Sequence, residues 1–407
     1  MDKTKIMGLL VKAALFAQEN EESVTPDDSG SLELTDNDWE EIYRELEAHA
    51  IAGIPFEWAM EHLKIPEAVR SRWEQSRMNQ VVVFSRLLQE QSELCRLMQD
   101  AGIPMVILKG TAAAMYYPDP FARAMGDIDF LVGKSDFQRA YQLMKDNGYQ
   151  LMYEENHSKN HITLHKNGFM FEIHHQPVGV LDDCKEGEYL LELIWNGIEN
   201  AEIADIDFCR VPMLPWLQNG IVLLTHIVRH LKTGIGLRHI IDWMMYVNSK
   251  LHDDNWYGSM RPVLEKAGLE TMTKSVTRMC QLYLGLSEKE ITWCSDADES
   301  VCGDLMSYII MQGNFGRKVL MQDKGARIVG EVHNPIQFFK LLQEKGLARW
   351  ELAQKHPVFK CVAWLYTICR YIKKSLQRKA PVKTLVADVK AGKDRRKLFD
   401  ELELYQK

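Results

Sequence analysis

The sequence predicts an α+β fold in which a small mixed β-sheet core lies between two helical regions. Short apolar runs typical of strands gather between residues 103 and 212. On both sides of this stretch, apolar residues recur at the three- and four-residue spacing of helices. We therefore expect an N-terminal helical arm over 1–95, a sheet-containing core over 96–212 and an all-helical region over 213–407.

The composition is that of an ordinary globular protein of 407 residues, with 46% hydrophobic and 26% charged residues. The formal net charge of −8 argues against non-specific nucleic-acid binding, so nucleic acid is not expected as a partner. The eight cysteines form no CxxC pair and no zinc-type cluster, which favours reduced, mostly buried thiols. A signal-peptide pattern and a transmembrane-length apolar run are both absent from the sequence, so a cytoplasmic location is expected.

The N-terminal arm is expected to consist of helices. Thr35 or Asp36 caps a helix that extends to about Ala50, because short polar side chains accept hydrogen bonds from the first backbone N–H groups of a helix. A longer helix follows over 67–100, where apolar residues recur near the helical period. This helix leads directly into the first strand and thereby connects the arm to the core.

The core is expected to alternate strands and helices. Five strands are predicted at residues 105–108, 126–132, 149–153, 162–165 and 169–174. The Asn-Gly pair at 167–168 is a strong hairpin signal between the last two strands. One more short strand is expected near 206–211, after a helical stretch.

Asp127 and Asp129 lie two residues apart on the second predicted strand. Because side chains alternate across a strand, both carboxylates point to the same face. Adjacent carboxylates repel each other and resist full ionisation unless a cation joins them. Oxygen ligands at this spacing suit Mg²⁺, which proteins commonly hold with a few carboxylates and substrate phosphates. The pair therefore predicts a metal site.

The sequence Asp-Ile-Asp-Phe occurs a second time at residues 205–208. This copy does not follow a Gly-Thr turn and a helix. We therefore interpret Asp205 and Asp207 as solvated carboxylates of an edge strand.

The stretch from 108 to 132, LKGTAAAMYYPDPFARAMGDIDFLV, resembles a known fold. A strand, a Gly-Thr turn, a helix and a strand with alternating hydrophobic residues and aspartates are similar to DNA polymerase β-like nucleotidyltransferases. Within that superfamily, the chain most resembles the uncharacterised bacterial nucleotidyltransferase family NTP_transf_5, over roughly residues 95–250. The resemblance implies an enzyme that uses two Mg²⁺ ions, with Mn²⁺ as a substitute. It would transfer a nucleoside monophosphate from an NTP such as ATP to a small molecule, sugar, peptide or protein.

A third carboxylate is expected on a neighbouring strand, and Glu172 is the best candidate. It interrupts an apolar strand, where a charged residue is costly unless it is paired or bound to metal. The resemblance places a carboxylate at the same position. Glu154 and Glu155 are the alternatives. His174 lies on the same face as Glu172, either to contact phosphate or the acceptor or as a structural histidine.

Gly110 and Thr111 are expected to form a phosphate-facing turn, because glycine allows close backbone approach and the next helix offers free N–H groups. Lys109 and Arg123 are candidates for neutralising the phosphates. Arg123 is favoured, because a guanidinium binds phosphate through two hydrogen bonds. The pattern is not a P-loop, since Lys109 precedes the glycine.

Two patterns in the helical region allow more than one interpretation. His226 and His230 share a helix face at a spacing that can bind zinc, but no third ligand is near in sequence, so packing or a phosphate contact is favoured. Arg238 and Asp242 have the spacing of an ion pair along a helix. Similar residues lie beside the active cleft in the resembled family, so a nucleotide-binding role for Arg238 is the other interpretation.

The C-terminal part is basic, with 16 Lys and Arg against four Asp and Glu between residues 340 and 397. Solvated helix faces are expected there, and a surface for an anionic partner is the alternative. The apolar segment 358–372 is expected to be a core helix, with membrane-surface contact as the alternative.

These observations predict a Mg²⁺-dependent nucleotidyltransferase with an unidentified acceptor. Two other functions remain open. A catalytically silent nucleotide-binding or scaffold protein would keep the fold and lose the chemistry. An RNA-modifying nucleotidyltransferase is favoured by the basic C-terminal part and disfavoured by the acidic total.

Overall fold

The computed structural model describes residues 3–16, 34–152, 160–177, 179–314, 335–376 and 381–405. The chain forms two compact units: Met1–Lys318 with Leu402–Lys407, and Val319–Glu401. The domain boundaries predicted near residues 95 and 212 both lie within the first unit, and they stay a prediction.

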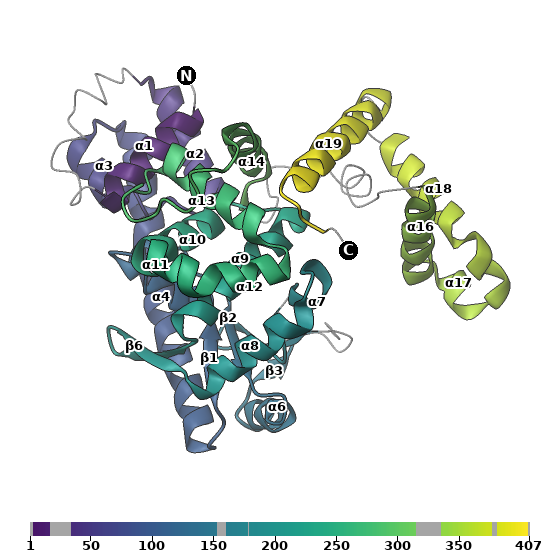
Figure 1. The fold of residues 1–407 in the computed structure, drawn as a ribbon, viewed down its shortest axis with the longest axis horizontal. Helices are drawn as coiled ribbons and strands as arrows, with labels where there is room; N and C mark the ends of the chain where they lie inside the picture. Colours follow the sequence, from purple (N-terminus) through teal and green to yellow (C-terminus); the bar gives the residue numbers. More distant parts are fainter. Residues whose placement is uncertain are drawn as a thin grey trace. The chain divides into compact units, whose positions relative to one another are not determined.

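A seven-stranded mixed sheet lies in the first unit (Figure 1). Its strands are β1 (Met105–Leu108), β2 (Ile128–Val132), β3 (Gln150–Leu151), β4 (His161–Lys166), β5 (Phe169–His174), β6 (Glu202–Ile206) and β7 (Cys209–Met213). Their spatial order is β3-β4-β5-β2-β1-β7-β6. The sheet is mixed because β1 is antiparallel to β2 but parallel to β7, and β2 is parallel to β5. The predicted α+β fold with helices at both ends is confirmed.

The composition of strands β1 and β2 accounts for their position in the interior of the sheet. Every residue of β1 and β2 is buried, as expected for largely apolar strands covered on both faces. Asp129 is the only polar residue of β2, and it pairs with Leu108 on one side and Glu172 on the other. The parallel register of β2 and β5 thus places two carboxylates on adjacent strands.

Two hairpins complete the sheet. Asn167 and Gly168 both have positive φ, 53° and 86°, as a two-residue turn requires, so the predicted β4–β5 hairpin is confirmed. The single strand expected near 206–211 is wrong, since Asp207 and Phe208 form a second tight turn between β6 and β7. The turn contains no glycine, because Asp207 itself adopts the positive φ of 52°. Asp205 and Asp207 are exposed at this edge, as expected.

The helices before the sheet follow the sequence signals closely. They are α1 (Lys3–Phe16), α2 (Asp36–Ala48), α3 (Phe56–His62) and α4 (Glu67–Asp100). Thr35 and Asp38 form a reciprocal capping box at the start of α2. The 34-residue α4 is about 50 Å long at the usual helical rise, and it packs against β7.

The helices after β1 complete the first unit. They are α5 (Gly110–Ala114), η1 (Pro120–Ala122), α6 (Phe137–Asp146), α7 (Val180–Asp183), α8 (Gly187–Glu199), α9 (Trp216–Thr233), α10 (Leu237–Lys250), α11 (Asp253–Asn255), η2 (Trp256–Met260), α12 (Arg261–Ala267), α13 (Glu270–Leu284) and α14 (Glu299–Gln312). Most residues of helix α10 are buried. It packs against α9, which lies beside it in Figure 1. The short α5 contacts both β1 and α10, which places α10 beside the end of β1.

The second unit contains α16 (Pro335–Arg349), α17 (Glu351–Lys355), η4 (Pro357–Val362), α18 (Ala363–Leu376) and α19 (Pro381–Glu401). The core helix expected over 358–372 is wrong, because Pro357 starts a separate 3₁₀ turn before α18. Val358, Leu365 and Ile372 are 79%, 46% and 48% exposed, since so small a unit offers few partners for its apolar side chains.

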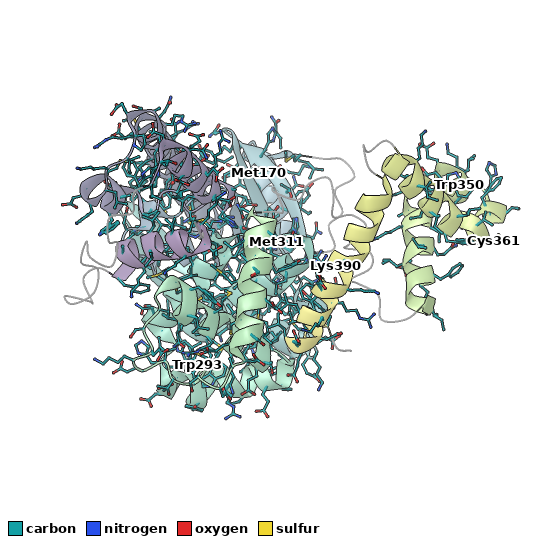
Figure 2. All side chains as sticks on the ribbon, turned by 90° about the horizontal axis from the view of Figure 1, so that it is seen from above. Met170, Trp293, Met311, Trp350, Cys361 and Lys390 are labelled. Atoms are coloured by element: carbon teal, nitrogen blue, oxygen red, sulfur yellow. The ribbon has the colours of Figure 1, made fainter. Side chains whose placement is uncertain are left out.

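The cysteine side chains agree with the expectation that most of them are buried. All eight cysteines are free and five are buried, whereas Cys361, labelled in Figure 2, is exposed. Within the described part of the chain, none of the helices combines the length and hydropathy that a membrane-crossing segment needs.

Candidate active site

The candidate active site begins where β1 ends. Lys109 and Gly110 have φ values of 53° and 40° at the start of α5. Positive φ is uncommon for a non-glycine residue, and such backbone is often found at functional sites. The turn places Lys109 Nζ 2.9 Å from Asp129 Oδ1. The Lys109 side chain is only 14% exposed, so its ammonium contacts the carboxylate and is mostly shielded from solvent.

Three carboxylates meet at this end of the sheet. Asp127 immediately precedes β2, Asp129 lies within it, and Glu172 is the register partner of Asp129 on β5. Their ligand oxygens all lie within 4.8 Å of one another. The alternatives Glu154 and Glu155 lie outside the residues that the structure describes.

The two aspartates have opposite electrostatic surroundings. Repulsion from Asp129, with burial as the second cause, raises the pKa of Asp127 to about 6. Burial also opposes ionisation of Asp129, but Lys109 and His174 outweigh it and hold the pKa of Asp129 well below its usual range. Burial likewise disfavours the Lys109 ammonium, and the charge of Asp129 raises the pKa of Lys109 above its ordinary value. The charge of Asp129 is therefore balanced by Lys109 and His174, whereas the charge of Asp127 is disfavoured by repulsion and burial.

His174 contacts Asp129 and Glu172 and is 1% exposed. Its Nε2 is 2.9 Å from Asp129 Oδ1, and its Nδ1 is 3.3 Å from the carbonyl oxygen of Gln176. Burial would lower the pKa of His174, but the hydrogen bonds to Asp129 and Glu172 raise it. With an acceptor at each nitrogen, the imidazolium can donate twice. This arrangement favours the structural histidine, which orients Asp129, over a contact with phosphate or the acceptor.

A cavity of 240 Å³ opens over the carboxylates. The residues that line it are Lys109, Gly110, Arg123, Gly126, Asp127, Asp129, His161, Glu172, His226, Arg229, His230, Thr233 and Arg238. Seven of the nine predicted site residues are therefore together, and Thr111 and His174 are the two that do not line the cavity.

Thr111 has a structural contact in place of the expected phosphate contact. Its side chain is fully buried, and its hydroxyl donates to Oε1 of Gln91 on α4 at 2.7 Å. This bond connects the turn after β1 to the long N-terminal helix. The neighbouring Gly110 remains the part of the turn that faces the cavity.

Arg123 was expected to form a bidentate contact with phosphate. In the structure it forms a bidentate contact with the Asp242 carboxylate. Nε and Nη2 donate to the two carboxylate oxygens, each at 2.7 Å, and both side chains are almost fully buried. The Tyr117 hydroxyl donates to the same carboxylate at 2.8 Å. Arg238, the partner expected for Asp242, donates to the carbonyl of Ala124 at 3.1 Å. Arg123 thus connects the loop before β2 to α10.

The cavity contains residues that the sequence did not single out. His161 pairs with His174 across the β4–β5 hairpin, and its Nε2 lies 3.6 Å from Glu172 Oε1. Counting back from the Asn-Gly turn would have placed His161 there, because the turn fixes the register. Arg229 and Thr233 share the face of α9 that carries His226, a polar stripe on an otherwise apolar helix.

A third imidazole joins the two histidines of α9. His239 of α10 lies with His226 and His230 so that their ligand nitrogens are all within 4.8 Å of one another. Burial lowers the pKa of all three side chains, that of His230 to about 4. The sequence places no third ligand close to His226 and His230, whereas the packing of α9 against α10 brings His239 to them.

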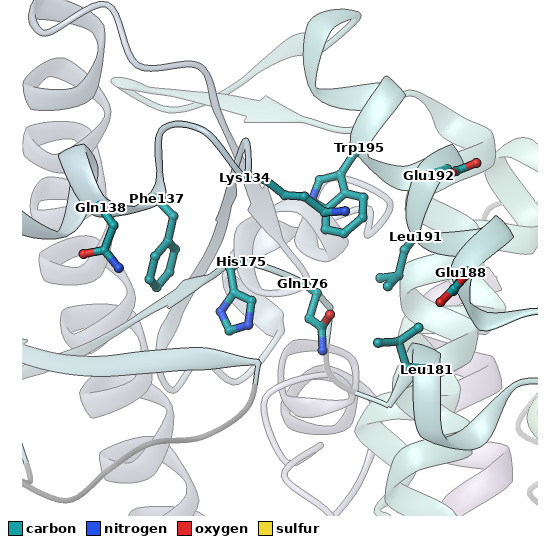
Figure 3. Close-up of a pocket in the computed structure, with 10 residues that line it drawn as sticks. All are labelled: Lys134, Phe137, Gln138, His175, Gln176, Leu181, Glu188, Leu191, Glu192 and Trp195. Carbon is teal, nitrogen blue, oxygen red and sulfur yellow. The ribbon is translucent and has the colours of Figure 1, made fainter.

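A larger cavity of 690 Å³ lies elsewhere on the first unit (Figure 3). Lys134 Nζ lies 3.6 Å from the centre of the Trp195 ring, and Phe137 and His175 also line this cavity. Size does not identify the reactive site here, since convergent charged groups with shifted pKa values are the stronger indicator. Those groups lie in the 240 Å³ cavity.

The carboxylate cluster fits a hard divalent cation. Asp127, Asp129 and Glu172 offer only oxygen atoms, the ligands that Mg²⁺ prefers. A cation between them would remove the repulsion that raises the pKa of Asp127. The donor set is therefore suited to a hard divalent cation such as Mg²⁺.

Comparison with known proteins gives one positive result. A search among curated proteins finds no match for this sequence. The sequence model of one family, described as uncharacterised nucleotidyltransferases, matches residues 35–285. The match covers more than half of the chain and includes every residue that lines the 240 Å³ cavity. The chain therefore belongs to this family of nucleotidyltransferases and is a transferase enzyme.

Proposed function

We propose that this protein transfers a nucleoside monophosphate from an NTP to a hydroxyl or similar acceptor, with Mg²⁺ held by Asp127, Asp129 and Glu172. The observation that carries the proposal is the convergence of these carboxylates at adjacent strand ends in a chain of this family. Two ions are proposed, because two-metal sites stabilise both the attacking and the leaving oxygen. Mn²⁺ would be accepted by the same oxygen ligands.

In this reaction the acceptor oxygen forms a bond to the α-phosphorus, the α–β phosphoanhydride bond breaks, and pyrophosphate leaves. Bound Mg²⁺ would supply a lowered pKa for the acceptor hydroxyl and charge stabilisation for pyrophosphate. Glu172 either holds an ion or accepts the acceptor's proton, since its side chain is 21% exposed at the cavity. Lys109 and His174 keep Asp129 ionised and oriented.

The triphosphate is proposed to lie among the cations of the cavity. Lys109, Arg229 and Arg238 line it, and Gly110 allows close approach of phosphate oxygens to the turn. The volume of 240 Å³ is below the range of roughly 300–1,000 Å³ for complete ligand pockets, so the phosphates occupy the cavity and the nucleoside extends from its mouth. Arg123 contributes by holding the wall through Asp242.

The order of elements supports membership of the DNA polymerase β-like superfamily. A strand, a glycine turn, a helix and an aspartate-bearing strand follow each other as β1, Gly110, α5 and β2. Bacterial origin, a cytoplasmic location, ATP as the nucleotide and an acceptor other than nucleic acid stay predictions from the sequence.

The proposal is tested with full-length protein, each of the four NTPs labelled at the α-phosphate, and Mg²⁺ or Mn²⁺. Acceptors are offered as metabolite pools, oligosaccharides, peptides, proteins and RNA. We expect label on one acceptor class with stoichiometric release of pyrophosphate, and at least about a 100-fold loss in Asp127→Asn, because a first ligand matters more than an outer-shell partner.

Asp205→Asn is the matched control, because it makes the same change in the same Asp-Ile-Asp sequence at an exposed sheet edge. It should transfer label as the wild type does. Equal losses in the two variants would refute the assignment of the metal site. NTP binding without transfer to any acceptor class would instead indicate a silent nucleotide-binding protein, and transfer to RNA would indicate an RNA-modifying enzyme.

A further inference from the structure

The wall of the cavity formed by α9 contains a second cluster of ligand atoms, made only of imidazoles. His226 and His230 belong to α9, and His239 belongs to α10, which packs against α9. The Nε2 atoms of His226 and His230 are 2.9 Å apart. All three ligand nitrogens lie within 4.8 Å of one another. Ligand atoms of a tetrahedral zinc ion are about 3.4 Å apart at the usual zinc–nitrogen distance, so small side-chain rotations suffice.

Backbone carbonyls orient two of the three rings. His230 Nδ1 lies 3.2 Å from the carbonyl oxygen of Gly234, and His239 Nδ1 lies 3.4 Å from that of Gly236. A proton on Nδ1 in each ring leaves Nε2 as the atom with a lone pair. Histidines that bind metal usually donate their other ring N–H to a carbonyl or carboxylate in this way. The loop between the two helices therefore orients the rings toward one point.

The ligand type selects a metal different from the one proposed for the carboxylates. Imidazole nitrogen suits Zn²⁺ and neighbouring transition metals, whereas Mg²⁺ prefers oxygen. His226 and His230 line the cavity, so a fourth coordination position would be accessible from it. Zinc sites with three protein ligands keep that position for water or substrate.

We propose that His226, His230 and His239 bind one transition-metal ion of the Zn²⁺ class, with a fourth position open to an oxygen or similar small ligand in the cavity. The site is separate from the carboxylate cluster on β2 and β5. It adds a second metal chemistry to the same cavity and does not depend on the proposed nucleotidyl transfer.

The test uses full-length protein treated with chelator and titrated with Co²⁺, whose visible absorption reports four-coordinate nitrogen ligation. We expect saturation at one equivalent, competition by Zn²⁺, and an X-ray absorption spectrum of the zinc-loaded protein with three imidazoles. Azide should change the Co²⁺ spectrum by entering the open position. A wild-type protein without this imidazole-ligated ion overturns the proposal, and an azide-insensitive spectrum overturns the open position.

Variants locate the ion. His239→Gln and, separately, His230→Gln should weaken Co²⁺ binding at least about 100-fold, with circular dichroism checking that each remains folded. His252→Gln, outside the cluster and with a side chain 44% exposed, should bind as the wild type does. His161→Gln tests the other histidine-containing group, formed by His161, Glu172 and His174. Loss of the ion in His161→Gln with retention in the α9 and α10 variants would overturn the assignment.

A separate measurement keeps this inference distinct from the proposed transfer. Calorimetry with a non-hydrolysable NTP and Mg²⁺ in chelator-treated wild-type protein measures nucleotide binding without the imidazole-bound ion, so each metal site is tested by its own assay. Failure of nucleotide binding with an intact Co²⁺ spectrum would count against the proposed function alone.

Discussion

At the scale of single residues, Asp127 and Asp129 make opposite contributions to stability although they are two positions apart. The folded protein holds the proton of Asp127 more tightly than the unfolded chain does, because the pKa is raised to about 6 from an ordinary value of 3.8. Its contribution is complete below about pH 4 and is lost as the pH rises through about 6. The pKa of Asp129 is lowered instead, so its contribution is present above the ordinary pKa and is lost only in strong acid.

Asp127→Asn should therefore stabilise the metal-free protein at pH 7.5 by roughly 1–3 kcal/mol, because it removes a repelled charge. At pH 4 the same change should have little effect, since Asp127 is then mostly protonated in the folded state. Urea unfolding at both pH values in the presence of EDTA measures the difference. Equal effects at the two pH values would show that Asp127 is not strained by Asp129.

Asp129→Asn should have the reverse sign. It leaves Lys109 Nζ and His174 Nε2 without the carboxylate that each contacts at 2.9 Å in a buried place. Removing one partner of a buried charge group costs roughly 3–5 kcal/mol, so the metal-free variant should unfold at lower urea at pH 7.5. Stabilisation by this change would contradict the arrangement described for Asp129.

At the scale of elements, one ion pair connects the loop before β2 to α10. Arg123 and Asp242 are both buried, so each charged group interacts with the other in place of solvent. Arg123→Ala should lower the free energy of unfolding by roughly 3–5 kcal/mol, because Asp242 is left as a buried charge with the Tyr117 hydroxyl. The double variant Arg123→Met/Asp242→Leu should recover most of this loss. A double variant as unstable as Arg123→Ala would mean that the pair is not the cause.

Arg229, on the face of α9 that lines the cavity, allows a test of where the triphosphate binds. The Arg229 side chain is 38% exposed and lines the cavity, with its Nη1 3.7 Å from Asp183. Arg229→Ala should weaken a non-hydrolysable NTP about tenfold, the value of one charge-assisted hydrogen bond of about 1.5 kcal/mol, with little change in stability. Arg70→Ala, on the exposed face of α4, is the control. Unchanged affinity in Arg229→Ala would place the triphosphate elsewhere.

At the scale of the whole molecule, the features that the sequence predicted well are those with local causes. The long helix α4 spans the predicted residues 67–100, and the Asn-Gly turn formed the expected hairpin. Glu172 was placed correctly on a strand beside Asp129, because one charged residue in an apolar strand limits the choices. The features that were missed depend on residues distant in sequence. Thr111 donates a hydrogen bond to Gln91 on α4, and Arg123 forms an ion pair with Asp242 on α10.

The third histidine was missed for the same reason. His226 and His230 share a helix face and are visible in the sequence, whereas His239 joins them only because α10 folds back on α9. The β6–β7 turn was missed for a local reason, since Asp207 adopts a backbone conformation that usually signals glycine. Apart from this turn, patterns within one element were predictable, whereas the contacts of Thr111, Arg123 and His239 with other elements were not.

The last residues of the chain provide a prediction for the first unit as a whole. Leu402–Lys407 belong to the compact unit that contains the cavity, although the residues before them form the second unit. Leu404 is 1% exposed, and the Tyr405 hydroxyl donates to the Val228 carbonyl of α9 at 2.5 Å. Lys232 of α9 lies 3.6 Å from the centre of the Tyr405 ring. The end of the chain therefore supports the helix that carries two cavity histidines.

Leu404→Ala should lower the free energy of unfolding by about 2–5 kcal/mol, the usual effect of removing a buried leucine side chain. Leu365→Ala, with a residue 46% exposed in the second unit, should change it by no more than about 0.5 kcal/mol. Hydrogen exchange measured by mass spectrometry should be faster in α9 peptides of the first variant and unchanged in those of the second. Unchanged α9 exchange in Leu404→Ala would mean that the C-terminal residues do not stabilise α9, since the loss of Leu404 packing would then remain local to the chain end.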